Sequence, residues 1–233
     1  SKSIKDHHRH VKAVLKALKK WGFKIAPHKS TWYAYEVKLL GYIVSGSKIK
    51  MNPDKVICIK NRPEPVNAKQ VQQALGLFNF YRRFIDKFAD RSRCLYELIK
   101  VGTEFIWNTE CKENYHYFIT CLTSEPAMRQ PILGQPFIVY SDGSKYAIGG
   151  VLAQIQDGVE YIIEYQSRLL RGSELNYGIS DIECLAVVFL IRKWHHYLYG
   201  VHFTLYTDHK ALTSLMSITN YHGRLGRQAM LLQ

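Results

Sequence analysis

The second half of the chain alternates short apolar runs with polar turns, a pattern typical of strands joined by tight connections. An apolar run at 137–140 ends at the polar stretch 141–144, of sequence SDGS, and a second run begins at Tyr146. Asp157-Gly158 then joins this run to a third, as in a two-residue hairpin turn. The pattern predicts three consecutive strands.

Beyond residue 180 the apolar period changes to that of a helix that stops at Gly200. One face of this helix carries Glu183, Val187, Leu190, Trp194 and Tyr197. Alternation returns at 202–208, and a short helix can begin at Lys210. The order strand, strand, strand, helix, strand, helix predicts an α/β (α+β) fold built on a mixed sheet.

The first half is richer in helical patterns. Helical spacing predicts a helix over His7–Trp21, and residues 23–25 and 32–44 are predicted to be strands of a hairpin-rich sheet. Three asparagines stand as capping residues at predicted helix starts: Asn52, Asn67 and Asn108. Three prolines then indicate a linker: Pro126, Pro131 and Pro136. We place a domain boundary in this linker, before residue 128.

Asp142 follows the first strand of the second half, where side chains lie at the rim of a sheet. By strand alternation it shares a face with Ile138 and Tyr140. A lone Asp-Gly pair is most often only a hairpin turn. Two later acidic residues change that interpretation.

Glu183 lies in line with the apolar stripe of its helix. Burial of an unpaired carboxylate is costly, so this acid needs a cation or a salt-bridge partner. A buried pair with an arginine, or a place in the frayed first turn where the helix dipole favours an acid, would also explain it. Asp181 fits these alternatives better, because its own stripe ends in the charged Arg192.

Asp208 ends the strand at 202–208, two residues after Tyr206 on the same face. Asp142, Glu183 and Asp208 can therefore converge on one sheet rim as catalytic, metal-binding residues. Such carboxylates repel one another unless divalent cations lie between them, and hard oxygen ligands favour Mg²⁺ or Mn²⁺. Two such ions about 3.5–4 Å apart support in-line attack on a phosphodiester.

The net charge of +13 is distributed unevenly. Residues 1–127 hold 23 basic and 11 acidic residues, a net charge of +12, whereas residues 128–233 hold 9 and 8, a net charge of +1. The basic half suits a polyanion such as nucleic acid, although solvated lysine faces would give the same excess. Near-neutrality in the second half suits a domain that concentrates acids at a metal site.

The five cysteines form no CxxC pair, which favours buried thiols in a reducing compartment over disulfides or zinc. No apolar segment approaches 18 residues and no signal peptide is visible. We therefore expect a soluble, intracellular protein with no membrane partner.

Arg82 and Arg83 lie among aromatic residues in the sequence FYRRF at 80–84. Basic residues interleaved with aromatic ones fit nucleic-acid contact through phosphate pairing and stacking. An aromatic core with the arginines in water is the simpler alternative.

Four blocks of the second half occur in a characteristic order: SDGSKYAIGGVLAQ, NYGISDIECLAVVFLIRKWHHYLYG, FTLYTDHKAL and RLGRQAMLLQ. In this order they resemble the ribonuclease H domain of gypsy-class long-terminal-repeat retrotransposon polyproteins. Upstream, LGYIVS, PDKVICIKNRPEPVNAKQVQQALGLFNFYRRFI and FIWNTECKENYHYFITCLTSEPAM resemble the reverse transcriptase of the same polyproteins. The resemblance covers essentially the whole chain.

The resemblance implies three regions. Residues 1–50 would be the C-terminal end of the reverse transcriptase palm, residues 51–127 the thumb and connecting region, and residues 128–233 a ribonuclease H-like domain truncated at its C-terminus. Leu40-Gly41-Tyr42 resembles the primer grip, which holds the growing DNA end. The match to a thumb favours nucleic-acid contact for Arg82 and Arg83, with the neighbouring Tyr81 and Phe84 in the core.

The implied activity is Mg²⁺-dependent cleavage of the RNA strand of RNA:DNA hybrids during reverse transcription, with Mn²⁺ as an alternative metal. The implied partners are the hybrid, the primer–template duplex, and the polymerase palm and fingers and the integrase of the same polyprotein. The family also implies a cytoplasmic location in a virus-like particle.

Two departures from the family bear on activity. The chain contains no paired-aspartate polymerase motif, and the family's fourth ribonuclease H acid would follow Gln233. SDGS also replaces the commoner TDAS but keeps the acid. We expect this chain to be a fragment that cannot polymerise DNA. By itself it is expected to cleave hybrids weakly or not at all. The alternative is a non-catalytic nucleic-acid-binding remnant of a decayed or host-adopted retroelement.

Overall fold

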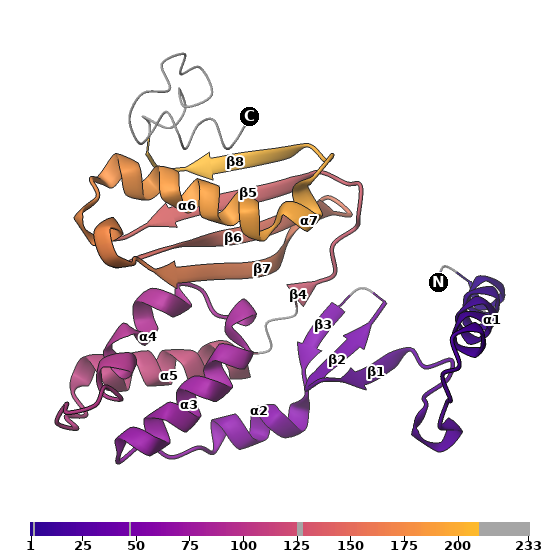
Figure 1. Ribbon diagram of the computed structural model, residues 1–233, viewed down its shortest axis with the longest axis horizontal. Helices are drawn as coiled ribbons and strands as arrows, with labels where there is room; N and C mark the ends of the chain where they lie inside the picture. The colour runs from indigo at the N-terminus through magenta and orange to yellow at the C-terminus, as the bar shows by residue number, and fades with distance from the viewer. Residues whose placement is uncertain (2, 47, 125–127, 210–233) are drawn as a thin grey trace.

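The computed structural model describes residues 1, 3–46, 48–124 and 128–209, which form two four-stranded sheets with helices against them (Figure 1). The first sheet contains, in spatial order, β1 (Glu36–Leu39), β2 (Tyr42–Ser45), β3 (Lys48–Met51) and β4 (Met128–Arg129). The second contains β7 (Val159–Leu169), β6 (Ala147–Gln156), β5 (Phe137–Gly143) and β8 (Phe203–Thr207). Because β8 runs parallel to β5 while β5, β6 and β7 pair antiparallel, the second sheet is the mixed sheet that the sequence predicted.

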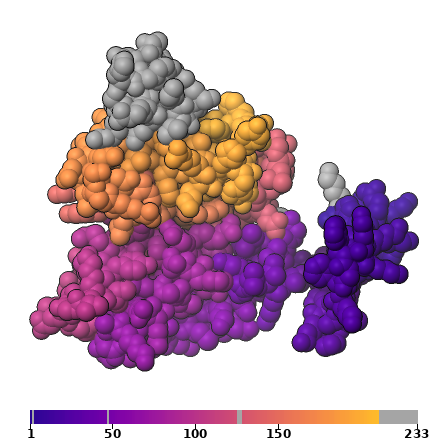
Figure 2. Space-filling model, in the orientation of Figure 1, coloured from indigo at the N-terminus to yellow at the C-terminus, as the bar shows by residue number. Residues whose placement is uncertain are grey.

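The N-terminal helix α1 (Ile4–Lys20) stands apart from the rest of the molecule. Its first turn is capped by Ser3, whose side chain accepts a hydrogen bond from the Asp6 backbone N–H. None of its residues is buried, and it forms a separate indigo lobe in Figure 2. The predicted helix over 7–21 is confirmed, but it adds nothing to the core. A short 3-10 helix, η1 (Pro27–Lys29), follows it.

The strands predicted at 23–25 and 32–44 are wrong in their extent. Residues 23–25 form no strand, and the second run is broken into β1 and β2 by a two-residue turn at Leu40-Gly41. Both turn residues have positive φ, 48° and 84°. This conformation reverses the chain, and apolar residues alone do not reveal it.

Four helices that lie between β3 and β4 in the sequence make up what we call the helical region: α2 (Pro53–Lys60), α3 (Ala68–Phe80), α4 (Phe88–Glu97) and α5 (Thr109–Thr123). The three predicted asparagine caps are confirmed, since each side-chain oxygen accepts a hydrogen bond from a backbone N–H of the first turn. Caps of this kind stabilise a helix by about 1 kcal/mol each.

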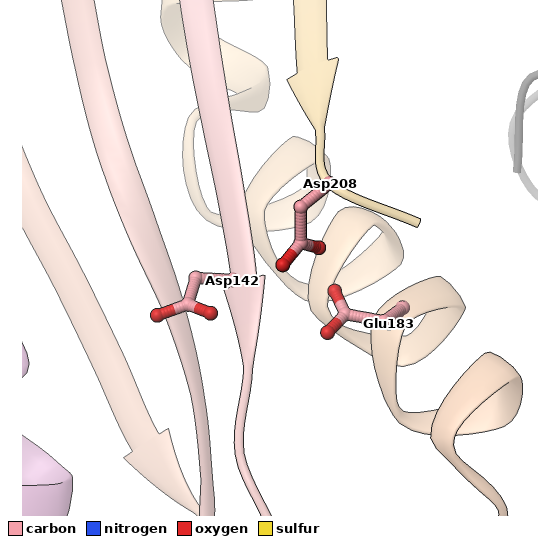
Figure 3. Close-up of side chains that lie close together, drawn as sticks. All are labelled: Asp142, Glu183 and Asp208. Carbon is pink, nitrogen blue, oxygen red and sulfur yellow. The ribbon is translucent and has the colours of Figure 1, made fainter. Parts of the chain in front are cut away.

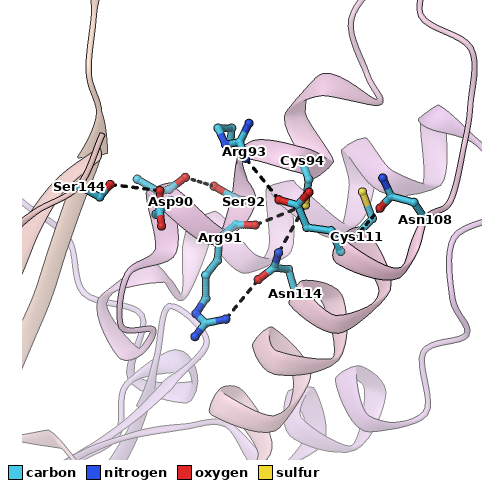
Figure 4. Close-up of polar contacts among 11 residues, drawn as sticks. Asp90, Arg91, Ser92, Arg93, Cys94, Asn108, Cys111, Asn114 and Ser144 are labelled. Atoms are coloured by element: carbon cyan, nitrogen blue, oxygen red, sulfur yellow. Dashed lines mark hydrogen bonds and ion pairs between the residues drawn. The ribbon is translucent and has the colours of Figure 1, made fainter. Parts of the chain in front are cut away.

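An aromatic cluster forms the centre of the helical region. Phe78, Tyr115 and Phe118 are fully buried, and the Phe78 ring lies 5.5 Å and 5.2 Å from the other two. Polar contacts also tie α4 to α5, including Arg91 to the Asn114 side-chain oxygen at 3.3 Å (Figure 4). The helical region therefore has its own core.

The boundary placed before residue 128 separates residues that the fold keeps together. Met128 and Arg129 form β4, which pairs with β3 in the first sheet, and Met128 is buried in the core of the helical region. Pro131 and Pro136 follow β4, in the connection to β5. The following linker is held by the buried Gln154, which hydrogen-bonds both the N–H and the C=O of Ile132.

The second sheet is covered on one face by α6 (Ile179–Lys193) and α7 (His195–Leu198) (Figure 1). The sequence predicted one continuous helix, but the buried Trp194 separates the two. A side chain at Gly150 of β6 would lie 2.0 Å from the Tyr140 carbonyl oxygen and 2.5 Å from Leu190. Glycine at this position therefore allows α6 to pack closely on the sheet. A 3-10 helix, η3 (Gly172–Asn176), precedes α6.

None of the helices among the described residues is long and apolar enough to cross a membrane.

Candidate metal centre

Asp142 and Asp208 come from neighbouring strands that run in the same direction. In the register of β5 and β8, Tyr140 is opposite Tyr206 and Ser141 is opposite Thr207. The two tyrosine rings stack with centroids 5.2 Å apart, two residues before the acids. Because parallel strands end at the same edge, the two aspartates meet there.

The strand that carries Asp142 is longer than predicted. The SDGS stretch was predicted to be a turn, but β5 continues to Gly143, and Asp142 pairs with Gly149 of β6. The turn comes one residue later, where the Ser144 hydroxyl accepts hydrogen bonds from the backbone N–H groups of Tyr146 and Ala147. Asp142 is therefore held by a strand pairing, which fixes its backbone more firmly than a free turn would.

Glu183 approaches from α6. It is only 4% exposed, and it lies on the predicted face with the buried Val187, Leu190 and Trp194. A side chain at Gly143 would lie 2.8 Å from Ile182 and 3.2 Å from the Glu183 carboxylate oxygen Oε1. Gly143 therefore makes room for the close approach of α6 to the end of β5.

The three acids converge as the sequence predicted. One carboxylate oxygen from each of Asp142, Glu183 and Asp208 lies within 4.8 Å of the others (Figure 3). Burial, together with the charges of Asp208 and Asp142, raises the pKa of Glu183 to about 7. The same crowding that opposes ionisation without a cation would favour binding of a divalent ion.

The donor set fits a hard divalent cation. Three carboxylates offer only oxygen ligands, which Mg²⁺ and Mn²⁺ prefer. The buried Oε2 atom of Glu183 has no hydrogen-bond partner among the residues that the structure describes. A buried carboxylate oxygen without a partner is costly, and a metal ion would remove that cost.

Asp181, the nearby acid that the sequence set apart, lies in the first turn of α6 and is not in this cluster. The short helix predicted from Lys210 lies outside the described residues.

The proposed primer-grip residues lie at the tip of the β1–β2 hairpin. Leu40 is 79% exposed, whereas the backbone beside it is anchored to the end of α3. The Tyr81 hydroxyl donates to the Gly41 carbonyl at 3.2 Å, and the Tyr42 hydroxyl donates to the Phe80 carbonyl at 3.0 Å. A side chain at Gly41 would lie 2.9 Å from the Tyr81 hydroxyl. Glycine at this position thus allows the backbone of the hairpin tip to lie close to the end of α3.

Arg82 and Arg83 follow directly, in the 3-10 helix η2 (Arg82–Phe84), and both face the second sheet. Arg82 donates a hydrogen bond to the Ser167 carbonyl, and the Arg83 guanidinium lies 3.8 Å from the Glu164 carboxylate. The flanking Tyr81 and Phe84 are buried, as expected. The arginines thus have intramolecular partners, and their contact with nucleic acid remains a prediction.

Two residues of the site were not found from the sequence. Gly143 was assigned to a turn, whereas it belongs to β5, and a glycine within a strand often marks the close approach of another segment. Lys87, at the N-terminus of α4, places its ammonium nitrogen 2.6 Å from Asp142 Oδ2. No local pattern indicates this ion pair, because it joins residues 55 positions apart in the sequence.

The second half of the chain matches a known family. Residues 133–233 match the RNase H-like domain found in reverse transcriptase. The chain is 32% identical over 209 residues, 90% of its length, to the retrovirus-related Pol polyprotein from transposon 412 of Drosophila melanogaster. It is also 32% identical over 243 residues, 100% of its length, to the transposon Tf2-3 polyprotein of Schizosaccharomyces pombe. The chain spans 17% and 18% of the lengths of these two relatives.

Solved structures share the fold. The foamy viral protease-reverse transcriptase in complex with an RNA/DNA hybrid superposes with a TM-score of 0.77 at 21% identity, covering 100% of this chain and 32% of that one. The same type of protein in complex with double-stranded DNA gives a TM-score of 0.72 at 22% identity, covering 99% and 49%. Residues 133–233 accordingly belong to the RNase H-like domains found in reverse transcriptase, and the chain is homologous to part of the retrovirus-related and transposon Pol polyproteins.

Proposed function

We propose that this chain supplies the metal-dependent nuclease site of a retroelement reverse transcriptase, which cleaves the RNA strand of RNA:DNA hybrids. The observation that carries the proposal is the convergence of three carboxylates from β5, α6 and the end of β8 within 4.8 Å. The RNase H-like match of residues 133–233 supports the reaction class.

Asp142, Glu183 and Asp208 would hold Mg²⁺, with Mn²⁺ as an alternative. Bound divalent ions activate a water molecule and stabilise the leaving oxygen in phosphodiester hydrolysis. The protein's own contribution is position: the parallel register fixes the two aspartates at one edge, and the buried Glu183 is held against Gly143. Such pre-arranged ligands do not need to reorganise when the metal binds.

We further propose that the basic first half holds the nucleic acid. Its net charge of +12 suits phosphate contact, and the Leu40–Tyr42 hairpin tip lies beside Arg82 and Arg83 through its contacts with the end of α3. A related foamy viral enzyme was solved with an RNA/DNA hybrid. The polymerase palm and fingers and the integrase of the same Pol polyprotein remain the proposed protein partners.

The test is cleavage of a labelled RNA:DNA hybrid with Mg²⁺, by this chain and by a chain extended past Gln233. Asp142→Asn, Glu183→Gln and Asp208→Asn should each reduce the cleavage rate at least about 100-fold, because each removes a metal ligand. Hybrid binding should persist.

Asp181→Asn is the matched control, since Asp181 lies on the same helix outside the cluster. It should cleave at close to the parent rate. Cleavage that tolerates Glu183→Gln but not Asp181→Asn would overturn the assignment. A complete absence of cleavage in both chains, with hybrid binding intact, would favour the non-catalytic binding remnant.

A further inference from the structure

An ion pair joins the helical region to the acidic cluster. Lys87 Nζ lies 2.6 Å from Asp142 Oδ2, and both side chains remain about half exposed. Lys87 belongs to the N-terminus of α4, whereas Asp142 belongs to β5 of the second sheet. Lys87 thus pairs with one of the three carboxylates that converge in the cluster.

The backbone around Lys87 is built to face the second sheet. Lys87 has a φ of 50°, in the left-handed region, so it marks a sharp change of direction before α4. Just after it, the Ala89 N–H donates to the Ser167 hydroxyl at 3.0 Å. The Ser144 hydroxyl donates to the Asp90 carboxylate at 3.3 Å (Figure 4). These contacts hold the start of α4 beside Asp142.

The surroundings give Lys87 more than one acidic neighbour. A cavity between the start of α4 and the second sheet has Asp86, Lys87, Asp90 and Asp142 among its lining residues. The carboxylates of Asp86 and Asp90 act electrostatically on the Lys87 ammonium group, in addition to Asp142. If Lys87 leaves Asp142, the other two carboxylates remain within electrostatic reach.

We propose that the ion pair between Lys87 and Asp142, which we call the latch, inhibits the metal centre. The Lys87 ammonium group occupies the Asp142 carboxylate while the helical region packs against the second sheet. It must move away before a divalent cation binds. An ammonium group and a dication compete for the same carboxylate and repel each other. Occupation of the centre is thereby coupled to the contact between the helical region and the second sheet. The inference rests on the proposed metal centre.

The latch predicts that loss of the lysine strengthens cation binding. We expect Mn²⁺, titrated into the full chain by calorimetry without nucleic acid, to bind Lys87→Met about 3- to 5-fold more tightly than the parent, the upper part of the range expected from a half-exposed ion pair. Lys87→Gly should behave alike, and glycine also suits the positive φ at this position.

Lys38→Met is the matched control. Lys38 of β1 forms a more exposed ion pair with Asp54 of α2, at 3.1 Å. This variant removes the same charge from a pair that does not involve the cluster, so its Mn²⁺ affinity should stay within about twofold of the parent.

The outcomes separate the latch from the metal centre. Equal Mn²⁺ affinities for the parent, Lys87→Met and Lys87→Gly would overturn the latch and leave the metal centre standing. Mn²⁺ binding that Asp142→Asn does not weaken, or no saturable binding in any variant, would overturn the metal centre and the latch with it. A second measurement needs no metal: the effects of Lys87→Met and Asp142→Asn on urea unfolding should be non-additive, and simple additivity would also overturn the latch.

Discussion

The absence of a side chain at Gly143 sets how closely Glu183 approaches the end of β5. A Cβ there would meet Ile182 at 2.8 Å and the Glu183 carboxylate at 3.2 Å, so α6 or the carboxylate would have to move. Interiors are packed too tightly to absorb such a shift without cost. The geometry of the acidic cluster therefore depends on a residue that bears no functional group.

Gly143→Ala should weaken Mn²⁺ binding about 10-fold and lower the free energy of unfolding by about 1–3 kcal/mol, the usual cost of overpacking. Calorimetric titration and urea unfolding measure the two effects. Gly46→Ala is the control, because a Cβ at the exposed Gly46 would meet nothing within 4 Å. If both variants bind Mn²⁺ like the parent, Gly143 does not set the position of Glu183.

At the scale of elements, one acid holds the turn between α2 and α3 against α5. Glu64 accepts a hydrogen bond from the Trp107 indole at 3.0 Å and contacts His116 at 2.7 Å and Lys112 at 3.3 Å. The Tyr115 hydroxyl also donates to the neighbouring Pro63 carbonyl at 3.0 Å. These contacts close the helical region on one side.

The helical region should lose stability in acid through Glu64. Its contacts with His116, Trp107 and Lys112 lower the pKa of Glu64 to about 2 in the folded state, from an ordinary value of 4.5. A lowered folded-state pKa contributes stability above pH 4.5, and that contribution disappears as the pH falls from 4.5 towards 2. Urea unfolding between pH 7 and pH 2.5 should show this loss in the parent.

Glu64→Gln cannot titrate, so its stability should depend less on pH in that window. The variant should be less stable than the parent at pH 7 and approach it at pH 2.5. Parallel curves for the two proteins would show that Glu64 does not carry this part of the acid sensitivity.

At the scale of the whole molecule, a basic half and a nearly neutral half meet along β7. Arg82, Arg83 and Ala89 contact this strand through Ser167 and Glu164. The interface links the hairpin tip, the helical region and the acidic cluster in one body. A nucleic acid held by the first half could therefore reach the cluster of the second.

Binding of a primer–template duplex by the full chain should weaken steeply with salt, with a log–log slope of roughly −0.9 for each phosphate neutralised. Replacement of the exposed Lys48 and Lys50 of β3 by glutamine should flatten this slope. Replacement of the exposed Lys145 and Lys193 in the second half is the matched control and should change it less. Fluorescence anisotropy at several salt concentrations measures the slope for each variant. An equal change of slope in both variants would contradict the assignment of binding to the first half.

The sequence by itself determined the elements whose signals are local. Asparagine caps, helical periodicity and strand alternation need only neighbouring residues, so the helix starts, the mixed sheet and the faces of Asp142, Glu183 and Asp208 were predictable. The extents of β5 and of the β1–β2 hairpin were not, because strand pairing and positive φ depend on the partner strand and the turn.

Only the tertiary structure decided contacts between distant segments. The pairing of β4 with β3, the approach of Glu183 to Gly143, and the ion pair between Lys87 and Asp142 each join residues far apart in sequence. Their energies come from packing and electrostatics across interfaces, which no local pattern encodes. The three acids could therefore be identified from the sequence, whereas the contact of Lys87 with Asp142 depends on how the helical region packs against the second sheet.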